Sequence, residues 1–89
     1  MSESIPFKAI IIDDSPQAIR LLRYMLKDLA PSISVVGEAQ NVEEGLLLIQ
    51  DKNPDAIFLD IEMPGRSGIQ LAEELRTIGY SGNIVFTIE

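Results

Sequence analysis

FKAIIIDDSP, residues 7–16, is the stretch of sequence that decides the fold. It opens with a short apolar run rich in isoleucine, which is typical of a strand buried on both faces of a parallel sheet. Asp13 and Asp14 close this run with charge. Ser15 and Pro16 then supply a helix N-cap and a proline at the first helical position. The segment therefore predicts a strand, an acidic turn and a helix in direct succession.

The rest of the chain repeats this alternation of apolar runs and helical segments. Further strands are expected at residues 33–37, 56–59 and 84–88. Helices are expected to begin after the caps Ser15, Asn41 and Ser67 and to end near Pro31, Asn53-Pro54 and Gly79. The order βαβαβαβ implies parallel crossover connections and an open α/β sheet.

Helical spacing of apolar residues indicates which sides of these helices are expected to meet the sheet. The apolar positions are Ala18, Leu22, Met25, Leu26 and Leu29 in the first helix, Leu46, Leu47 and Ile49 in the second, and Leu71, Leu75 and Ile78 in the third. The three helices are therefore predicted to be amphipathic.

Composition limits both the size and the chemistry of the molecule. Its 89 residues suffice for one small domain, and a hydrophobic content of 46% argues against disorder. Acidic residues outnumber basic ones by 14 to 7, and the net charge of −7 argues against direct binding to nucleic acid. No apolar run is long enough to span a membrane.

Two residue types are missing from the sequence. The absence of cysteine excludes a disulfide framework and thiolate metal sites, and it fits a cytoplasmic protein. The absence of histidine excludes a Ser-His-Asp triad, a histidine metal ligand and a phosphohistidine relay within these residues.

Aspartates follow two of the predicted strands. Asp13 and Asp14 come after the first strand, and Asp60 comes after the third. Ligands of open α/β sheets bind outside the carboxyl ends of the strands, so these side chains converge if the two strands are neighbours. Like charges at about 4 Å repel by roughly 4 kcal/mol near a protein surface, which raises a pKa or recruits a cation. Oxygen ligands alone favour Mg²⁺, with Mn²⁺ or Ca²⁺ as alternatives.

A Mg²⁺ ion beside a carboxylate suggests phosphoryl chemistry. The carboxylate can act as the nucleophile, and the metal neutralises charge on the transferring group. Because the chain has no histidine, the phosphoryl donor must be another molecule. For any one aspartate, a solvated position at a strand end is the commoner explanation. The combination of three aspartates with a proline turn is less common.

Three pieces of the sequence, residues 10–16, residues 54–65 and Gly68, together resemble the receiver domain of two-component response regulators. The resemblance runs from about Phe7 to the end, and it implies a single receiver domain over residues 1–89. The implied fold is a flavodoxin-like (CheY-like) open parallel sheet with strand order 2-1-3-4. Residues 58–65 look most like receivers attached to LytTR-type DNA-binding domains.

The resemblance implies a role for each matching residue of the acidic site. Asp60 would accept a phosphoryl group from a sensor histidine kinase. Asp14 would bind Mg²⁺ directly, Asp13 would bind it through water, and Asp60 and the backbone carbonyl of Glu62 would be further ligands.

The resemblance also assigns roles outside the acidic cluster. Pro64 and Gly65 would shape the loop beside the site, and Gly68 would start the third helix. Thr87 is the candidate for the switch hydroxyl of the family. Counting from the acceptor through a loop of typical length puts Ile88 at that position instead, and one deletion in the preceding turn restores Thr87.

Up to residue 89, the chain is expected to be C-terminally incomplete compared with the family. It lacks the fourth helix, the fifth strand with its catalytic lysine, and the fifth helix; Lys8, Lys27 and Lys52 sit elsewhere in the pattern. An open edge on the fourth strand and uncovered apolar surface predict a homodimer or swapped assembly, or an unstable monomer. Chemical phosphorylation is expected to be weak without the lysine.

Three functions are compatible with these residues. The first is a signalling receiver, which is not itself an enzyme. The second is an interaction or dimerisation module that keeps the receiver fold without switching. The third is a phosphohydrolase with an aspartate nucleophile, since residues 60–62 are loosely similar to the Asp-x-Asp motif of haloacid-dehalogenase-like enzymes.

Overall fold

Four parallel strands lie side by side in the order β2-β1-β3-β4 in the computed structural model, which describes residues 7–88. The strands are β1 (Phe7–Ile12), β2 (Ile33–Ala39), β3 (Ala56–Asp60) and β4 (Asn83–Thr87), and the helices are α1 (Pro16–Leu29), α2 (Val42–Lys52) and α3 (Gly68–Thr77). The pairing is parallel throughout, as a βαβ succession requires. The predicted fold class and strand order are confirmed.

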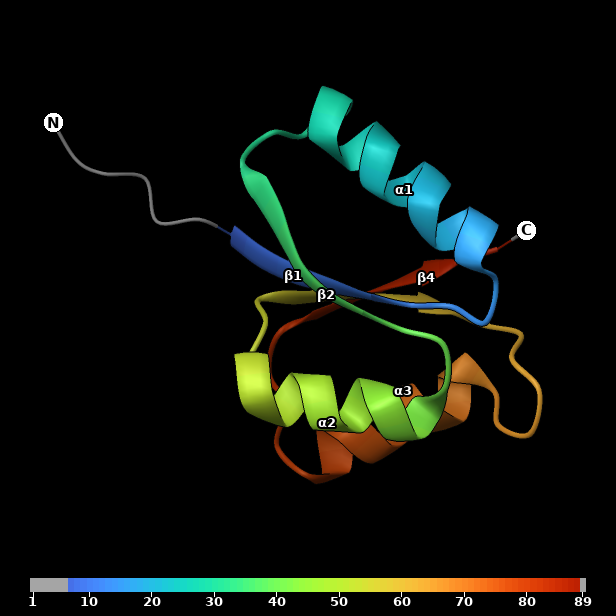
Figure 1. Ribbon diagram of the computed structural model, residues 1–89. Coiled ribbons are helices and arrows are strands. Elements are labelled where there is room, and N and C mark those ends of the chain that lie inside the picture. Colours follow the sequence, from blue (N-terminus) through green and yellow to red (C-terminus); the bar gives the residue numbers. More distant parts are fainter. Residues whose placement is uncertain (1–6, 89) are drawn as a thin grey trace, which may run out of the picture.

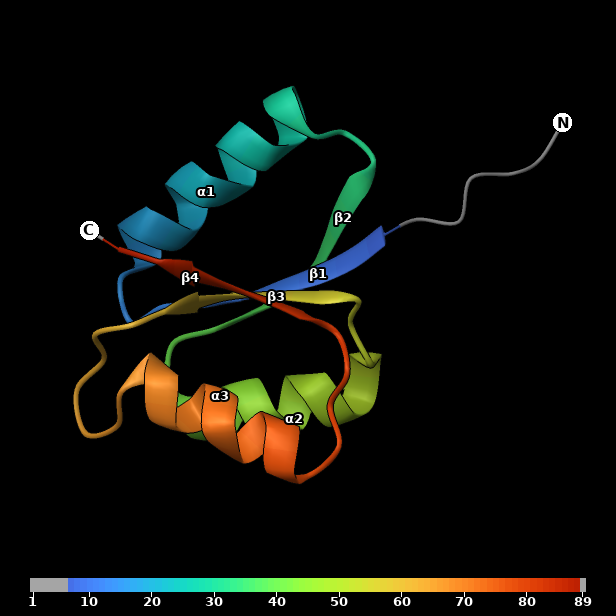
Figure 2. The ribbon, with the colours of Figure 1, turned by 180° about the vertical axis from the view of Figure 1, so that it is seen from behind.

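Helices cover the two faces of the sheet unequally. α1 lies alone on one face, and α2 and α3 lie on the other, as Figures 1 and 2 show from opposite sides. The main apolar core lies between the sheet and the pair α2 and α3, and consists of Ile10, Ile12, Ala39, Val42, Ile49, Ile57, Leu59, Met63, Leu71 and Leu75. In β1, Ala9 to Ile12 are at most 2% exposed, so this strand is covered on both sides. That burial explains its unbroken apolar sequence.

Side-chain caps fix the start of every helix at the residue that the sequence predicted. The Ser15 hydroxyl accepts a hydrogen bond from the Ala18 N–H at 3.2 Å. The Asn41 side chain accepts one from the Glu44 N–H at 2.9 Å. Ser67 forms a reciprocal capping box with Gln70. These bonds satisfy main-chain donors that the first turn of a helix leaves unpaired.

The structure corrects several details of the sequence-based expectations. In α1, Met25 and Leu29 are 44% and 74% exposed, and Ile19 is the buried residue. A single helix covers only part of a sheet face, and Met25 lines an open hollow beside Thr87 and Ile88. Ile78 is also exposed because it is the cap residue at the end of α3. β2 and β3 extend to Ala39 and Asp60, and β4 is displaced by one residue from the predicted range. None of the helices within residues 7–88 combines the length and apolar character needed to cross a membrane.

Candidate functional site

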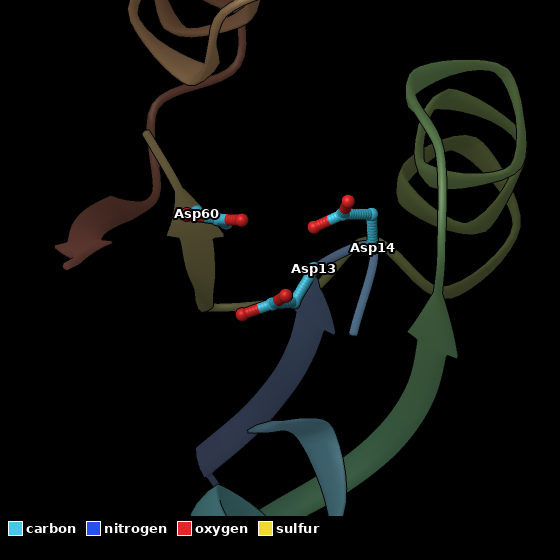
Figure 3. A group of neighbouring side chains, drawn as sticks. All are labelled: Asp13, Asp14 and Asp60. Atoms are coloured by element: carbon cyan, nitrogen blue, oxygen red, sulfur yellow. The ribbon is translucent and has the colours of Figure 1, made fainter. Parts of the chain in front are cut away.

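Asp13, Asp14 and Asp60 meet at the carboxyl ends of β1 and β3. Each offers a carboxylate oxygen, and these oxygens all lie within 4.8 Å of one another. Figure 3 shows the three side chains around a common space, with Asp14 and Asp60 facing each other. The two strands are neighbours, and Ile12 is paired with Leu59. The residues that follow this pair therefore emerge at the same level of the sheet, as the sequence predicted.

Main-chain hydrogen bonds orient two of these carboxylates. Asp13 Oδ1 accepts a bond from the Ser15 N–H at 2.9 Å. Asp60 Oδ1 accepts one from the Glu62 N–H at 3.1 Å. Asp13 and Asp60 are only 4% and 5% exposed, whereas Asp14 is open to solvent. The site thus has two nearly buried, oriented carboxylates and one exposed carboxylate at its entrance.

The charge of the cluster matches a divalent cation. Three carboxylates at this separation repel one another by up to about 4 kcal/mol per pair. In the part of the chain that the structure describes, Asp13 and Asp14 belong to none of the ion pairs. Mg²⁺ prefers hard oxygen donors and is usually held by one or two carboxylates while keeping several waters. An oxygen-only set with one side open to solvent fits that preference.

The loop that joins β3 to α3, residues 61–67, follows Asp60 directly. Met63 is 9% exposed and belongs to the core, so it anchors this loop to the body of the domain. This anchor was not expected from the sequence, although an apolar residue within a turn segment was its signal. Gly65 has φ +87°, and a Cβ there would meet nothing within 4 Å. Gly65 is therefore required for its backbone conformation rather than for space. Pro64 is exposed beside it.

Thr87 lies across from Asp60 in the sheet. The β3–β4 register pairs the two residues, and the Ile61 N–H donates to the Thr87 carbonyl at 3.3 Å. Thr87 and Ile88 both line an open hollow together with Asp13 and Ser15. Ile88 lies outside β4 and is 80% exposed. The strand register places Thr87 at the level of Asp60, and the function of Thr87 stays a prediction.

The lysines of the described residues lie away from this cluster. The Lys8 ammonium donates to the Lys52 carbonyl at 2.9 Å, near the start of β1 and the end of α2. Lys27 lies in the last turn of α1. The positively charged side chains at these positions therefore lie at the opposite end of the sheet or on α1.

Residues 9–88 match the family model of the response regulator receiver domain. The chain belongs to this family.

Among curated proteins, it is 42% identical over 85 residues to the nitrate/nitrite response regulator protein NarL of Escherichia coli strain K12, covering 96% of this chain and 39% of NarL. It is 40% identical over 79 residues to the sensory transduction protein LytR of Staphylococcus epidermidis, covering 89% of this chain and 31% of LytR. The chain thus spans less than half of the length of these relatives.

Solved receiver domains share the fold. The signal receiver domain of the putative response regulator NarL from Mycobacterium tuberculosis superposes with a TM-score of 0.83 at 30% identity, covering 93% of this chain and 66% of that one. The isolated receiver domain of RcsB from Salmonella enterica, solved in the presence of the phosphomimetic BeF₃⁻, gives a TM-score of 0.85 at 23% identity, covering 94% and 62%. At that identity, the second likeness shows the fold alone.

Proposed function

We propose that this chain is the phospho-accepting receiver of a response regulator, that Asp60 is its acceptor, and that Mg²⁺ is its cofactor. The observation that carries the proposal is the convergence of Asp13, Asp14 and Asp60 within 4.8 Å at one edge of the sheet. The donor is a sensor histidine kinase, and the compartment is the cytoplasm. Family membership and the absence of cysteine support these two assignments.

Each residue of the site has a part in this chemistry. A carboxylate oxygen of Asp60 forms the new bond to phosphorus as the bond to the donor histidine nitrogen breaks, and that nitrogen leaves with the electron pair. When bound, Mg²⁺ would neutralise charge on the phosphoryl group. Asp14 would hold the metal directly, Asp13 would hold it through water, and Asp60 and the Glu62 carbonyl would be further ligands. The Glu62 N–H keeps the Asp60 side chain in one orientation.

Thr87 completes the site as the switch hydroxyl. Its position opposite Asp60 in the register supports this role, because a side chain on a neighbouring parallel strand at the same level reaches the same edge of the sheet. Two solved structures that share this fold were obtained with a phosphate mimic. One structure contains CheX, CheY, BeF₃⁻ and Mg²⁺, and the RcsB receiver was solved with the same phosphomimetic.

Labelling with radioactive acetyl phosphate tests the acceptor assignment. We expect Mg²⁺-dependent labelling of the protein, and its reduction to background in Asp60→Asn. The matched control is Asp55→Asn, because Asp55 is an exposed aspartate immediately before β3. We expect this variant to be labelled like the unmodified protein. Equal labelling of the Asp60 variant would show that another residue accepts the group.

Two other functions predict different results. An interaction module that does not switch would keep the same oligomeric state with Mg²⁺ and BeF₃⁻. A phosphohydrolase would turn over a simple phosphomonoester. The family match over residues 9–88 supports a receiver over a phosphohydrolase. Some relatives are enzymes as whole proteins, such as the protein-glutamate methylesterase of Rhizobium etli, of which this chain covers 21%.

A second copy of the chain is the partner that we infer for the exposed edge of the sheet. β4 is an edge strand among the described residues, and Val85 and Phe86 on it are 43% and 42% exposed. An edge that pairs with its own copy buries these side chains and its unpaired main-chain groups. Because the net charge of −7 opposes association, added salt should increase the dimer fraction in sedimentation. A monomer at all salt concentrations would contradict this inference.

A further inference from the structure

We propose that Gly68 is a positioning residue for Asp60. Gly68 is the first residue of α3 and is buried against the end of β3. A Cβ built on it would lie 2.2 Å from the Asp60 carbonyl oxygen and 3.0 Å from both the Asp60 carbonyl carbon and the Ile61 Cα. All three are main-chain atoms. The missing side chain therefore allows α3 to sit directly against the backbone of the proposed acceptor.

A hydrogen bond holds the two segments in this contact. The Gly68 N–H donates to the Ile61 carbonyl at 2.8 Å. At the base of the loop between β3 and α3, Gly68 thus packs against the Asp60 main chain and donates a hydrogen bond to the Ile61 carbonyl. Any side chain at this position would have to separate the end of β3 from the start of α3.

The helix resists that separation more than the strand end does. Leu71 and Leu75 of α3 are fully buried in the main core. The pairing of β3 with β1 ends at Leu59, one residue before Asp60, whereas Asp60 is paired with Thr87 of β4. The displacement caused by a side chain at position 68 should therefore appear at Asp60.

This displacement has a consequence for the site that we propose above, and the inference rests on that proposed function. Ordinary van der Waals contact starts at 3.4 Å, against 2.2 Å here. An adjustment of roughly 1 Å at a reacting group can lower a rate by about 100-fold. We expect Gly68→Ala to slow labelling by acetyl phosphate by about that factor and to weaken Mg²⁺ binding at least about tenfold.

Gly37 provides a matched control. A Cβ at Gly37 would also be crowded, at 3.0 and 3.1 Å from the two Leu48 methyl groups. These neighbours are the end of a flexible side chain of α2, and Gly37 itself lies on β2, which contributes none of the three aspartates. Gly37→Ala is expected to lower the unfolding midpoint while leaving the Mg²⁺ affinity of the folded protein unchanged. A purely structural role of Gly68 would give the same pattern as this control.

The experiment compares the unmodified protein, Gly68→Ala and Gly37→Ala by amide NMR. Spectra of the metal-free proteins report main-chain displacement at Asp60 and Glu62, and a Mg²⁺ titration then reports affinity. Moved amides together with weaker binding and slower labelling, only in Gly68→Ala, support the proposal. Unmoved amides and unchanged affinity in Gly68→Ala would overturn it.

Two further outcomes are also decisive. If the unmodified protein binds no Mg²⁺, the proposed function fails, whereas the metal-free amide comparison still decides whether Gly68 positions Asp60. If Gly68→Ala is largely unfolded, the same spectra are recorded for all three proteins in trimethylamine N-oxide, which favours folded states. The criteria then apply unchanged to the folded population.

Discussion

At the carboxyl end of the sheet, Asp13, Asp14 and Asp60 bring like charges within 4.8 Å of one another. At the opposite end, the Asp55 carboxylate accepts a hydrogen bond from the Lys8 N–H at 2.8 Å. The Tyr80 hydroxyl there donates to the carbonyl of the buried Pro54 at 3.0 Å. Aspartate thus has two roles at the two ends of β3. At one end the carboxylates repel one another, and at the other a carboxylate accepts a main-chain hydrogen bond.

The two ends of β3 therefore differ in role. The end near Asp55 contributes to stability, and the end at Asp60 carries the acidic cluster of the proposed function. Only a few residues divide Asp55 from Asp60, yet Asp55 joins the starts of β1 and β3, and Asp60 belongs to the acidic cluster. Sites that must bind a cation keep unfavourable charge in the free protein, and the rest of the fold compensates for it. Substitutions at the two ends should therefore change different measurements.

The largest expected effect follows from Asp13→Asn. Asparagine keeps an oxygen that can accept the Ser15 N–H, so the local turn remains, but one charge of the cluster is lost. We expect Mg²⁺ affinity to fall by about 10- to 100-fold, as for other groups that orient metal ligands. The metal-free protein should become more stable, with about 4 kcal/mol as the upper limit for one relieved pair. Urea unfolding with and without Mg²⁺ measures the metal affinity and the stability of the metal-free protein. A metal-free variant that is less stable than the unmodified protein would contradict the inferred repulsion among the three carboxylates.

Asp55→Ala should give the opposite pattern and a smaller change. Loss of the acceptor for the Lys8 N–H is expected to lower the free energy of unfolding by about 0.5–1.5 kcal/mol. The Mg²⁺ affinity of the folded protein should not change. A change in Mg²⁺ affinity as large as that in Asp13→Asn would mean that the two ends of the sheet are coupled.

The smallest effect concerns Tyr80 and alkaline pH. Burial raises the pKa of Tyr80 above its ordinary value of 10.0, Arg76 opposes this rise, and Asp55 adds to it. Because the folded pKa is the higher one, the stabilisation is complete below pH 10.0 and is lost as the pH rises through the folded pKa.

Tyr80→Phe should therefore show a smaller loss of stability above the ordinary tyrosine pKa than the unmodified protein. At neutral pH it should be less stable by about 1 kcal/mol, because the bond to Pro54 is missing. Tyr24→Phe is the control, since Tyr24 is 72% exposed. Urea unfolding across this pH range measures the effect, and parallel pH curves for all three proteins would refute it.

Local signals in the sequence were enough to predict the order of the elements. Ser15, Asn41 and Ser67 each cap the helix that their position predicted. The apolar run before Asp13 predicted a strand buried on both faces. The convergence of the three aspartates also required the first and third strands to be neighbours, and that strand order came from the family resemblance.

Features that depend on spatial packing could not be predicted. Counting residues left open whether Thr87 or Ile88 faces Asp60, because the answer depends on the path of the turn after α3. The exposure of Met25 depends on the open hollow that it lines with Thr87 and Ile88, because a lone helix leaves part of the sheet face uncovered. The sequence placed Gly68 at the start of a helix, but the close contact of Gly68 with the Asp60 main chain requires coordinates.

The position of β4 at the rim of the described sheet has a mechanical consequence. β1 and β3 are each hydrogen-bonded on both sides, whereas β4 is bonded only to β3. Displacing β4 therefore breaks fewer bonds than displacing either inner strand, and its amides should exchange with solvent fastest among the strands that flank the cluster. Within residues 7–88, the strand opposite Asp60 can therefore be displaced at a lower cost than β1 or β3. A change at the acidic centre would reach the rim of the described sheet through this strand.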